Sequence, residues 1–200
     1  SGLEHAFLWT AATGTVDLGT LGGERSGAEA INDLGQVVGH AERPGPIHTS
    51  VAVLWTPTGQ AIDLGYLGES FPGFGSSRAT DINNSGQVVG VSTSTPHGTR
   101  AFLWTEAGGM VDLGTLGGDR SAADAINDAG QVVGRADTST GEEHAFLWSA
   151  ATGMIDLGTL GGQSSLALGI NASGHVVGRA DVESGDIHAF LWTPADGITL

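Results

Sequence analysis

The residues of this chain that could do acid–base chemistry recur at fixed spacing. His5, His144 and His188 each open a His-Ala-Phe-Leu-Trp run, and an Asp follows the Trp by eight residues in four copies. Hydrolytic catalysis by serine needs one nucleophile, one base and one orienting carboxylate at a single place. A His that recurs at this position in three of the five copies instead predicts a structural hydrogen bond between neighbouring repeat units, to an Asp such as Asp17, Asp112 or Asp156. We therefore expect no catalytic residues and no enzymatic activity.

The aspartates themselves are expected to be structural. Each stands in an Asp-Leu-Gly segment after a Val or Ile, where a carboxylate can accept backbone or Ser hydrogen bonds at a strand end. A Ser precedes the Asn of each repeat by six residues and is the expected donor. The residues concerned are Asp17, Asp63, Asp112 and Asp156, with Ser26, Ser77, Ser121 and Ser165.

Two acidic loops are weak candidates for a calcium site. Asp137 and Glu142 lie in one loop, and Asp181 and Asp186 lie in the corresponding loop of the next repeat. Carboxylate oxygens are the ligands that Ca²⁺ prefers. Neither loop has the spacing of an EF-hand, so solvated acidic loops are the simpler interpretation, and no cofactor is required.

An insertion in the second repeat adds exposed aromatic candidates. Phe71 and Phe74 lie in the segment Glu-Ser-Phe-Pro-Gly-Phe-Gly, and Tyr66 replaces the Thr of the other copies. Aromatic side chains on a loop can contact a protein or a sugar. These three residues are our candidates for partner binding.

The composition limits the partners. The 200 residues carry a formal net charge of −15, all seven basic residues are Arg, and Cys is absent. Such an acidic chain repels phosphate backbones, so we expect no nucleic-acid partner. No apolar run approaches the roughly 18 residues of a membrane helix, so we expect no membrane insertion.

A repeat of 44 to 49 residues dominates the chain. The five Trp residues mark its copies, which start near His5, Val51, Arg100 and His144, with a partial copy at His188. Each copy contains about four short strand candidates and ends in a Gly-containing tight turn between two of them. Four short strands repeated at this period indicate an all-β chain built as a β-propeller. We treat residues 1–200 as a single repeat domain.

The order of motifs within a repeat resembles that of a WD repeat and predicts the strand order of a blade. Ser-x-Ala-x-x-Ile-Asn would be the innermost strand, followed by Gln-Val-Val-Gly, His-Ala-Phe-Leu-Trp and finally Val-Asp-Leu-Gly. The count gives a third and a fourth strand, three complete blades, and the first three strands of a last blade. We expect four blades closed by the N-terminal strand. A β-solenoid and a fragment of a larger propeller are the alternatives.

The linked motifs resemble the HAF family of bacterial extracellular repeats, over essentially the whole chain. His-Ala-Phe-Leu-Trp, Asp-Leu-Gly-Thr-Leu-Gly-Gly and Ile-Asn-Asp-Leu-Gly-Gln-Val-Val-Gly carry the resemblance. It implies a secreted or surface-exposed bacterial protein with no catalytic residues to assign. The expected function is a non-enzymatic structural or protein-interaction module, with self-association through unpaired terminal strands. A lectin-like propeller that binds glycans or Ca²⁺ is the alternative.

Overall fold

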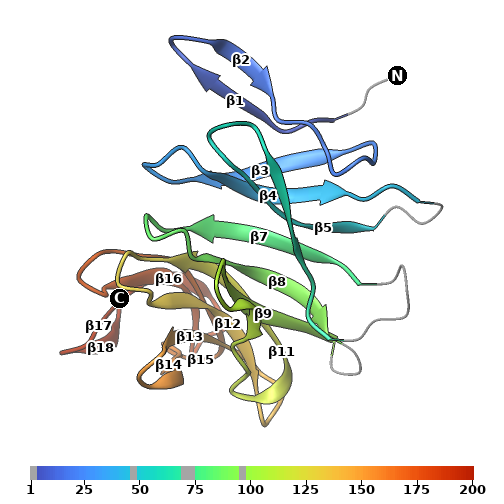
Figure 1. Ribbon diagram of the computed structural model, residues 1–200. Helices are drawn as coiled ribbons and strands as arrows, with labels where there is room; N and C mark the ends of the chain where they lie inside the picture. The colour runs from blue at the N-terminus through green and yellow to red at the C-terminus, as the bar shows by residue number, and fades with distance from the viewer. Residues whose placement is uncertain (1–3, 46–48, 69–74, 95–97) are drawn as a thin grey trace.

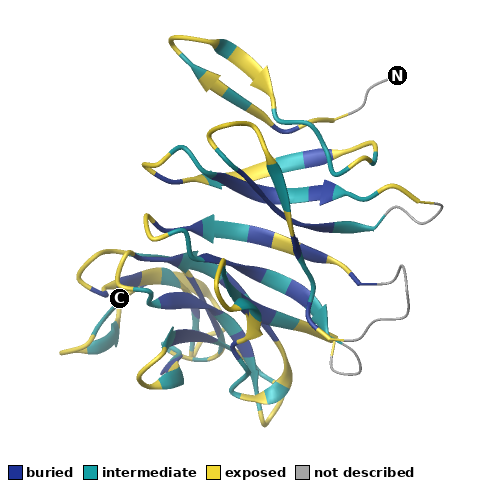
Figure 2. Ribbon diagram, viewed as in Figure 1, coloured by how far each residue is buried: buried dark blue, intermediate teal, exposed yellow. Residues whose placement is uncertain are grey.

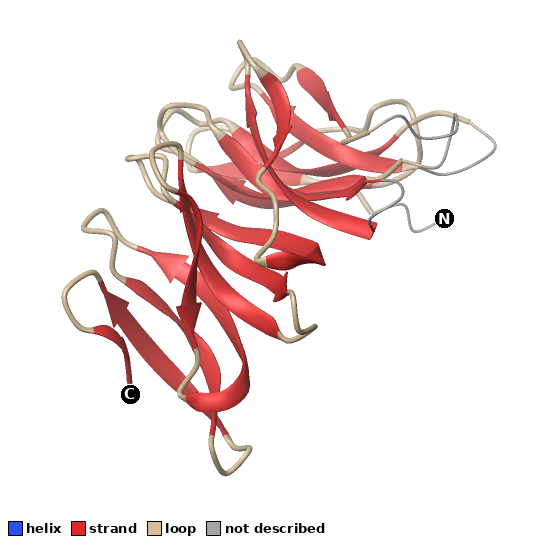
Figure 3. Ribbon diagram, turned by 90° about the horizontal axis from the view of Figure 1, so that it is seen from below, coloured by secondary structure: helices blue, strands red, loops and turns tan. Residues whose placement is uncertain are grey.

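The computed structural model describes residues 4–45, 49–68, 75–94 and 98–200, and every regular element in these ranges is a β-strand (Figure 3). None of the described residues forms a helix that is long and apolar enough to cross a membrane. The strands are β1 (Phe7–Thr10), β2 (Gly14–Asp17), β3 (Ser26–Ile31), β4 (Val37–Glu42), β5 (Ser50–Trp55), β6 (Ala61–Gly65), β7 (Ser77–Ile82), β8 (Val88–Ser94), β9 (Gly98–Thr105), β10 (Gly109–Asp112), β11 (Gly117–Ile126), β12 (Val132–Thr138), β13 (Glu143–Ser149), β14 (Gly153–Gly158), β15 (Gly161–Ile170), β16 (Val176–Val182), β17 (Ile187–Thr193) and β18 (Gly197–Thr199).

The strands form five small antiparallel sheets that follow one another along the chain (Figure 1). β1 and β2 form the first hairpin. Sheet I contains β3–β6, sheet II β7–β10, sheet III β11–β14 and sheet IV β15–β18, each with its strands in chain order. The inner strands β3, β7, β11 and β15 lie next to one another. The predicted all-β class and the predicted strand order of the repeat are therefore confirmed.

The predicted strand count and closure are wrong in two respects. The last sheet has its own fourth strand, β18, which pairs with β17, so sheets I to IV each have four strands. Within the described residues β2 pairs only with β1 and does not complete the last sheet. The first hairpin and sheet IV lie at opposite ends of a curved row of sheets (Figure 1).

Glycine is required where the second strand of each sheet pairs closely with the first at a bulge. Gly134 in β12 faces β11 at a bulge between Ala123 and Ala125. A Cβ at Gly134 would lie 2.1 Å from the carbonyl oxygen of Ala122, which no side chain can tolerate. Gly39, Gly90 and Gly178 meet the same backbone approach in their sheets. The Gly of the Gln-Val-Val-Gly motif is therefore a packing requirement.

The core lies between the sheets rather than within any one of them. One apolar cluster joins Val89 and Leu113 of sheet II to Ile126, Val132 and Phe146 of sheet III. The Phe and Trp side of each third strand faces the preceding sheet, and the Leu side faces the following sheet. Burial is accordingly highest in the middle of the row (Figure 2). Each sheet depends on both neighbours for its burial, because a single small sheet has too little core of its own.

Candidate functional site

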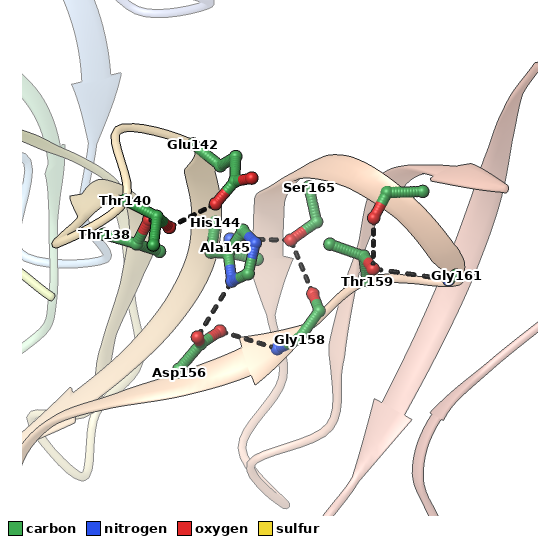
Figure 4. A network of polar contacts seen from close by, with 11 residues as sticks. Thr138, Thr140, Glu142, His144, Ala145, Asp156, Gly158, Thr159, Gly161 and Ser165 are labelled. Carbon is green, nitrogen blue, oxygen red and sulfur yellow. Dashed lines mark hydrogen bonds and ion pairs between the residues drawn. The ribbon is translucent and has the colours of Figure 1, made fainter. Parts of the chain in front are cut away.

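The His and Asp of the repeat form a hydrogen bond inside one sheet. Nδ1 of His144 in β13 lies 2.8 Å from Oδ2 of Asp156 in β14, and Oδ1 of Asp156 accepts from the N–H of Gly158 at 2.7 Å (Figure 4). His5 and Asp17 repeat this contact at 2.8 Å. The hydrogen bond with His5 lowers the pKa of Asp17. The predicted His–Asp pairing is confirmed, but the predicted placement between sheets is wrong.

The Ser residues, not the His residues, connect neighbouring sheets. Oγ of Ser165 in sheet IV accepts from the N–H of Ala145 in sheet III at 2.8 Å and donates to the carbonyl of Gly158 at 2.6 Å (Figure 4). The expected donation to the Asp is therefore wrong, because the Gly carbonyl two residues later receives it. Ser26, Ser77 and Ser121 make the equivalent pair of bonds.

These contacts exclude a serine triad at the place where Ser, His and Asp come together. A triad requires the Ser hydroxyl to donate to the His base. The Ser165 hydroxyl instead donates to the carbonyl of Gly158 and accepts from the backbone N–H of Ala145. The hydroxyl is thereby committed to joining two sheets.

A second connection runs along the inner strands. Nδ2 of Asn32 donates to the carbonyl of Asn83, Nδ2 of Asn83 donates to that of Asn127, and Nδ2 of Asn127 donates to that of Asn171, each at 3.0 Å. The side-chain oxygen of each Asn also accepts two backbone N–H groups of its own turn, as at Ala129 and Gln131 for Asn127. The Asn of the motif thus shapes its turn and binds the next sheet. The sequence showed its periodicity but not this second role.

Tyr66, a candidate partner-binding residue, lies over an ion pair. Arg43 donates from Nε and Nη2 to the two carboxylate oxygens of Asp63 at 2.6 and 2.7 Å. Its guanidinium carbon lies 5.5 Å from the centre of the Tyr66 ring, which is the geometry of a cation–π contact. Arg43 therefore replaces the His partner that the second repeat lacks. Phe71 and Phe74, the other two candidates, lie outside the described residues.

The four weak calcium candidates do not come together as a set of ligands. Glu142 accepts a hydrogen bond from Thr140, and Asp186 accepts one from Ser184 at 2.8 Å. Asp137 pairs with Glu143 across β12 and β13, and Asp181 lines a cleft beside Arg179. No group of three or more His, Asp or Glu side chains within the described ranges is arranged to hold a metal ion. The structure gives the calcium prediction no ligand set.

Three clefts open between successive sheets at equivalent positions. The cleft between sheets I and II has a volume of about 280 Å³, that between II and III about 310 Å³, and that between III and IV about 300 Å³. His40, Ser50 and Arg78 line the first of them. None of the three was a predicted site residue: His40 and Ser50 lie in the segment of variable length between Gly39 and Trp55, and Arg78 occupies an unspecified position of the Ser-x-Ala motif. Their only signal was that each departs from the residue at the equivalent position of the other repeats.

Two half-buried carboxylates, Asp81 and Asp124, lie near the contacts between sheets II and III and differ in their hydrogen bonding. Oδ1 and Oδ2 of Asp81 accept from the N–H groups of Ile82 at 2.8 Å and Ile126 at 2.9 Å. Oδ2 of Asp124 has no hydrogen-bond partner and lies 3.8 Å from Nη1 of Arg135. Burial raises the pKa of both residues. Asp81 holds two sheets together, whereas Asp124 has no comparable bond.

The stacked meanders around a shared set of inner strands define the fold as β-propeller-like. No family model matches the chain, and no curated protein matches it. Among solved structures, the chain is similar to TolB from Acinetobacter baumannii, a β-propeller, with a TM-score of 0.63 and 12% sequence identity. The match covers 95% of this chain and 46% of the TolB chain, so this chain spans less than half the length of that one. At this identity the likeness supports the fold alone, and membership of the HAF family stays a prediction.

Proposed function

We propose that the chain is a non-enzymatic, extracellular β-propeller that serves as a structural or protein-interaction module. The observation that carries the proposal is that the repeated polar side chains are engaged in hydrogen bonds within and between the sheets. His144 is bound to Asp156, Ser165 to two backbone groups, and Asn127 to its own turn and the next sheet. A motif whose polar side chains are all hydrogen-bonded within the protein stabilises the fold. Binding of a partner is then expected at the positions that vary between repeats.

The sequence supports the cellular location and the class of partner. The HAF resemblance favours a bacterial extracellular or surface position. A net charge of −15 disfavours nucleic acid as the partner. We propose a protein or glycan partner, without membrane insertion.

The first hairpin offers a surface for protein interaction or self-association. Phe7 and Trp9 are each 63% exposed on one face of β1. Within the described part of the chain β1 pairs with β2 on one edge, and no strand there pairs with its other edge. Exposed aromatic residues beside an open strand edge are suited to pairing with another strand.

Site-specific photo-crosslinking tests this proposal. A photoreactive phenylalanine analogue is placed at Trp9, with Thr152, an exposed residue in a turn of sheet III, as the matched control. We expect a discrete adduct, to a partner protein or a second copy, from position 9 and none from position 152. The interaction role is contradicted if the two positions give the same adducts. The non-enzymatic role is contradicted if the chain hydrolyses a substrate in a broad hydrolase panel and His144→Ala abolishes that activity.

A further inference from the structure

The three clefts lie at equivalent positions of the repeat but differ in the side chains that line them. Each cleft can therefore be compared with the other two. Ser50, Thr99 and Glu143 occupy the same position at the start of the third strand of sheets I, II and III. His40, Val91 and Arg135 occupy the same position in the second strand. Substitution at these positions changes a cleft without changing the fold.

The cleft between sheets I and II is rich in hydroxyl groups, whereas the other two are lined by charge. Its walls include Ser50, Ser76, Ser92, Thr93 and Thr99. The hydroxyls of Ser92 and Thr93 are hydrogen-bonded to the backbone of Leu67 and Ser76. The cleft between sheets III and IV has Glu143, Arg179 and Asp181. Ser92 is 1% exposed and stands where sheets I, III and IV have Ala. The polar character of this cleft is thus specific to one place in the row.

Two buried polar atoms in this cleft have no hydrogen-bond partner. They are Nδ1 of His40 and Oγ of Ser50, and both residues line the cleft. Nδ1 of His40 lies 3.7 Å from Oε1 of Glu29, beyond hydrogen-bond distance. Buried polar atoms without partners are uncommon and call for a bound water or ligand. The His40 ring lies against Gly27, where a Cβ would come within 2.6 Å of its Cε1 atom, so the ring is held in place.

The charges around the cleft are balanced. Arg78 forms an ion pair with Glu29. Burial, together with the positive charge of Arg78, lowers the pKa of His40, so its imidazole is neutral at pH 7. A site with hydroxyls, a neutral imidazole and a compensated guanidinium favours a neutral ligand with several hydroxyl groups.

We propose that the cleft between sheets I and II binds one neutral sugar unit of a glycan, whose hydroxyls form hydrogen bonds with Nδ1 of His40 and Oγ of Ser50. Its volume of about 280 Å³ lies just below the range of drug-sized ligand sites, which begins at about 300 Å³, and therefore fits no more than a single sugar ring. Arg78 at its rim donates to the ring substituents while keeping Glu29 as its partner. This inference goes beyond the protein-interaction role and does not depend on it.

A glycan array followed by calorimetry tests the site. The whole chain is screened on neutral and acidic glycans, and the best neutral monosaccharide is then titrated into four proteins. They are the parent, Ser50→Val, His40→Val, which installs the residue of the equivalent position in sheet II, and Ser164→Ala in the cleft between sheets III and IV as the matched control. We expect a loss of affinity of at least tenfold for the first two variants and no change for the third.

The outcomes that overturn the proposal are separate from those that concern protein interaction. Absence of any bound neutral glycan overturns it, as does binding that Ser50→Val leaves unchanged. A crystal soaked in the best monosaccharide that shows only ordered water at His40 and Ser50 also overturns it. If His40→Val fails to fold, Ser50→Val alone decides, because Ser50 begins a strand, where the β-branched Val is well tolerated. None of these results changes the expectation for crosslinking at Trp9.

Discussion

The first hairpin and the β5–β6 hairpin of sheet I carry the same motif but bury it to opposite extents. Val53 and Trp55 in β5 are fully buried, whereas Phe7 and Trp9 at the equivalent positions of β1 are each 63% exposed. Val53 and Trp55 pack against Ala6 and the partly buried Leu8 of the first hairpin. No sheet within the described residues covers Phe7 and Trp9 in that way. The neighbouring sheet, rather than the motif, decides whether the aromatic face is core or surface.

At the other end of the row, in sheet IV, the opposite face of the sheet is exposed. Val177 and Leu191 of sheet IV are 51% and 41% exposed, whereas Val133 and Leu147 at the equivalent positions of sheet III are 0% and 7% exposed. These residues belong to the face that packs against the following sheet. The aromatic face is thus exposed at one end and the aliphatic face at the other. Residues at equivalent positions of the repeat should therefore contribute differently to the free energy of unfolding, and mutation can measure the difference.

The largest difference is expected between two tryptophans. Trp55→Ala removes a fully buried side chain between two sheets and should lower the free energy of unfolding by about 3–5 kcal/mol. Trp9→Ala removes an exposed side chain and should change it by no more than about 0.5 kcal/mol. Urea denaturation of both variants provides the values. Equal losses would show that the first hairpin is covered in solution.

The row of side-chain bonds from Asn32 through Asn83 and Asn127 to Asn171, here called the asparagine ladder, should also contribute more stability in the interior than at its end. Asn127→Ala removes the bond to the carbonyl of Asn171 as well as three bonds within its own turn, one of them to the side chain of Gln131, and should cost about 2 kcal/mol. Asn171→Ala removes two equivalent turn bonds in an exposed setting and should cost less than about 1 kcal/mol. Thermal and urea unfolding of the pair checks this difference. A larger loss for Asn171 would contradict the ladder.

The seam beside Asp124 gives a prediction that depends on pH. Because burial raises the pKa of Asp124 in the folded state, the folded chain holds its proton more tightly than the unfolded chain. Stability is then lost as the pH rises from the ordinary Asp value through the raised one. Asp124→Asn should therefore stabilise the protein by about 1 kcal/mol at pH 7, since it removes a half-buried carboxylate whose Oδ2 has no hydrogen bond and only the 3.8 Å ion pair with Arg135.

The gain from Asp124→Asn should disappear as the pH falls below the ordinary Asp value of 3.8, where both states of the parent are protonated. Leu168→Asn changes the equivalent residue at the exposed end of the row and serves as the control, because Leu168 is 56% exposed. It should show no such pH dependence. Urea midpoints measured from pH 3 to pH 8 separate the two variants. A gain for Asp124→Asn that does not vary with pH would contradict the assignment.

The smallest effect is expected for the histidines. His144→Ala breaks the bond to Asp156 and should cost about 0.5 kcal/mol, because both side chains are partly exposed. In sheet IV the position equivalent to Asp156 is occupied by Leu200, because Thr199 pairs with Leu191 as Ile155 pairs with Leu147. His188 therefore lacks the carboxylate that binds His144. His188→Ala should therefore have no measurable effect on the urea midpoint. Equal losses for both variants would mean that the His–Asp bond contributes nothing.

The sequence predicted the elements of the fold well because each strand of the repeat carries its own local pattern. The order from the Asn-containing strand to the Asp-containing strand was correct, as was the tight turn at Gly130, where φ is 75°. The fourth strand of the last sheet was missed because β18 has only three residues and lacks the Asp of the motif. Closure was predicted wrongly because the curvature of the row depends on packing between sheets, which no local pattern encodes.

The site was less predictable than the fold. His144 and Asp156 were paired correctly because they lie on neighbouring strands of one sheet. The partners of Ser165 were assigned wrongly, because its bonds cross to another sheet and only the three-dimensional arrangement shows which carbonyl is nearest. His40 and Ser50 were not selected, because a polar residue in a variable position is usually solvated. Only their burial without partners distinguishes them.

Hydroxyl-radical footprinting of the five tryptophans tests the central claim most directly, because it reads the exposure of one motif position in every copy at once. The account predicts that Trp9 is oxidised fastest, that Trp55 is protected in the native state, and that Trp104, Trp148 and Trp192 fall between them, in line with their partial burial. Equal oxidation of Trp9 and Trp55, or protection of Trp9, would contradict the claim that neighbouring sheets decide the fate of the motif.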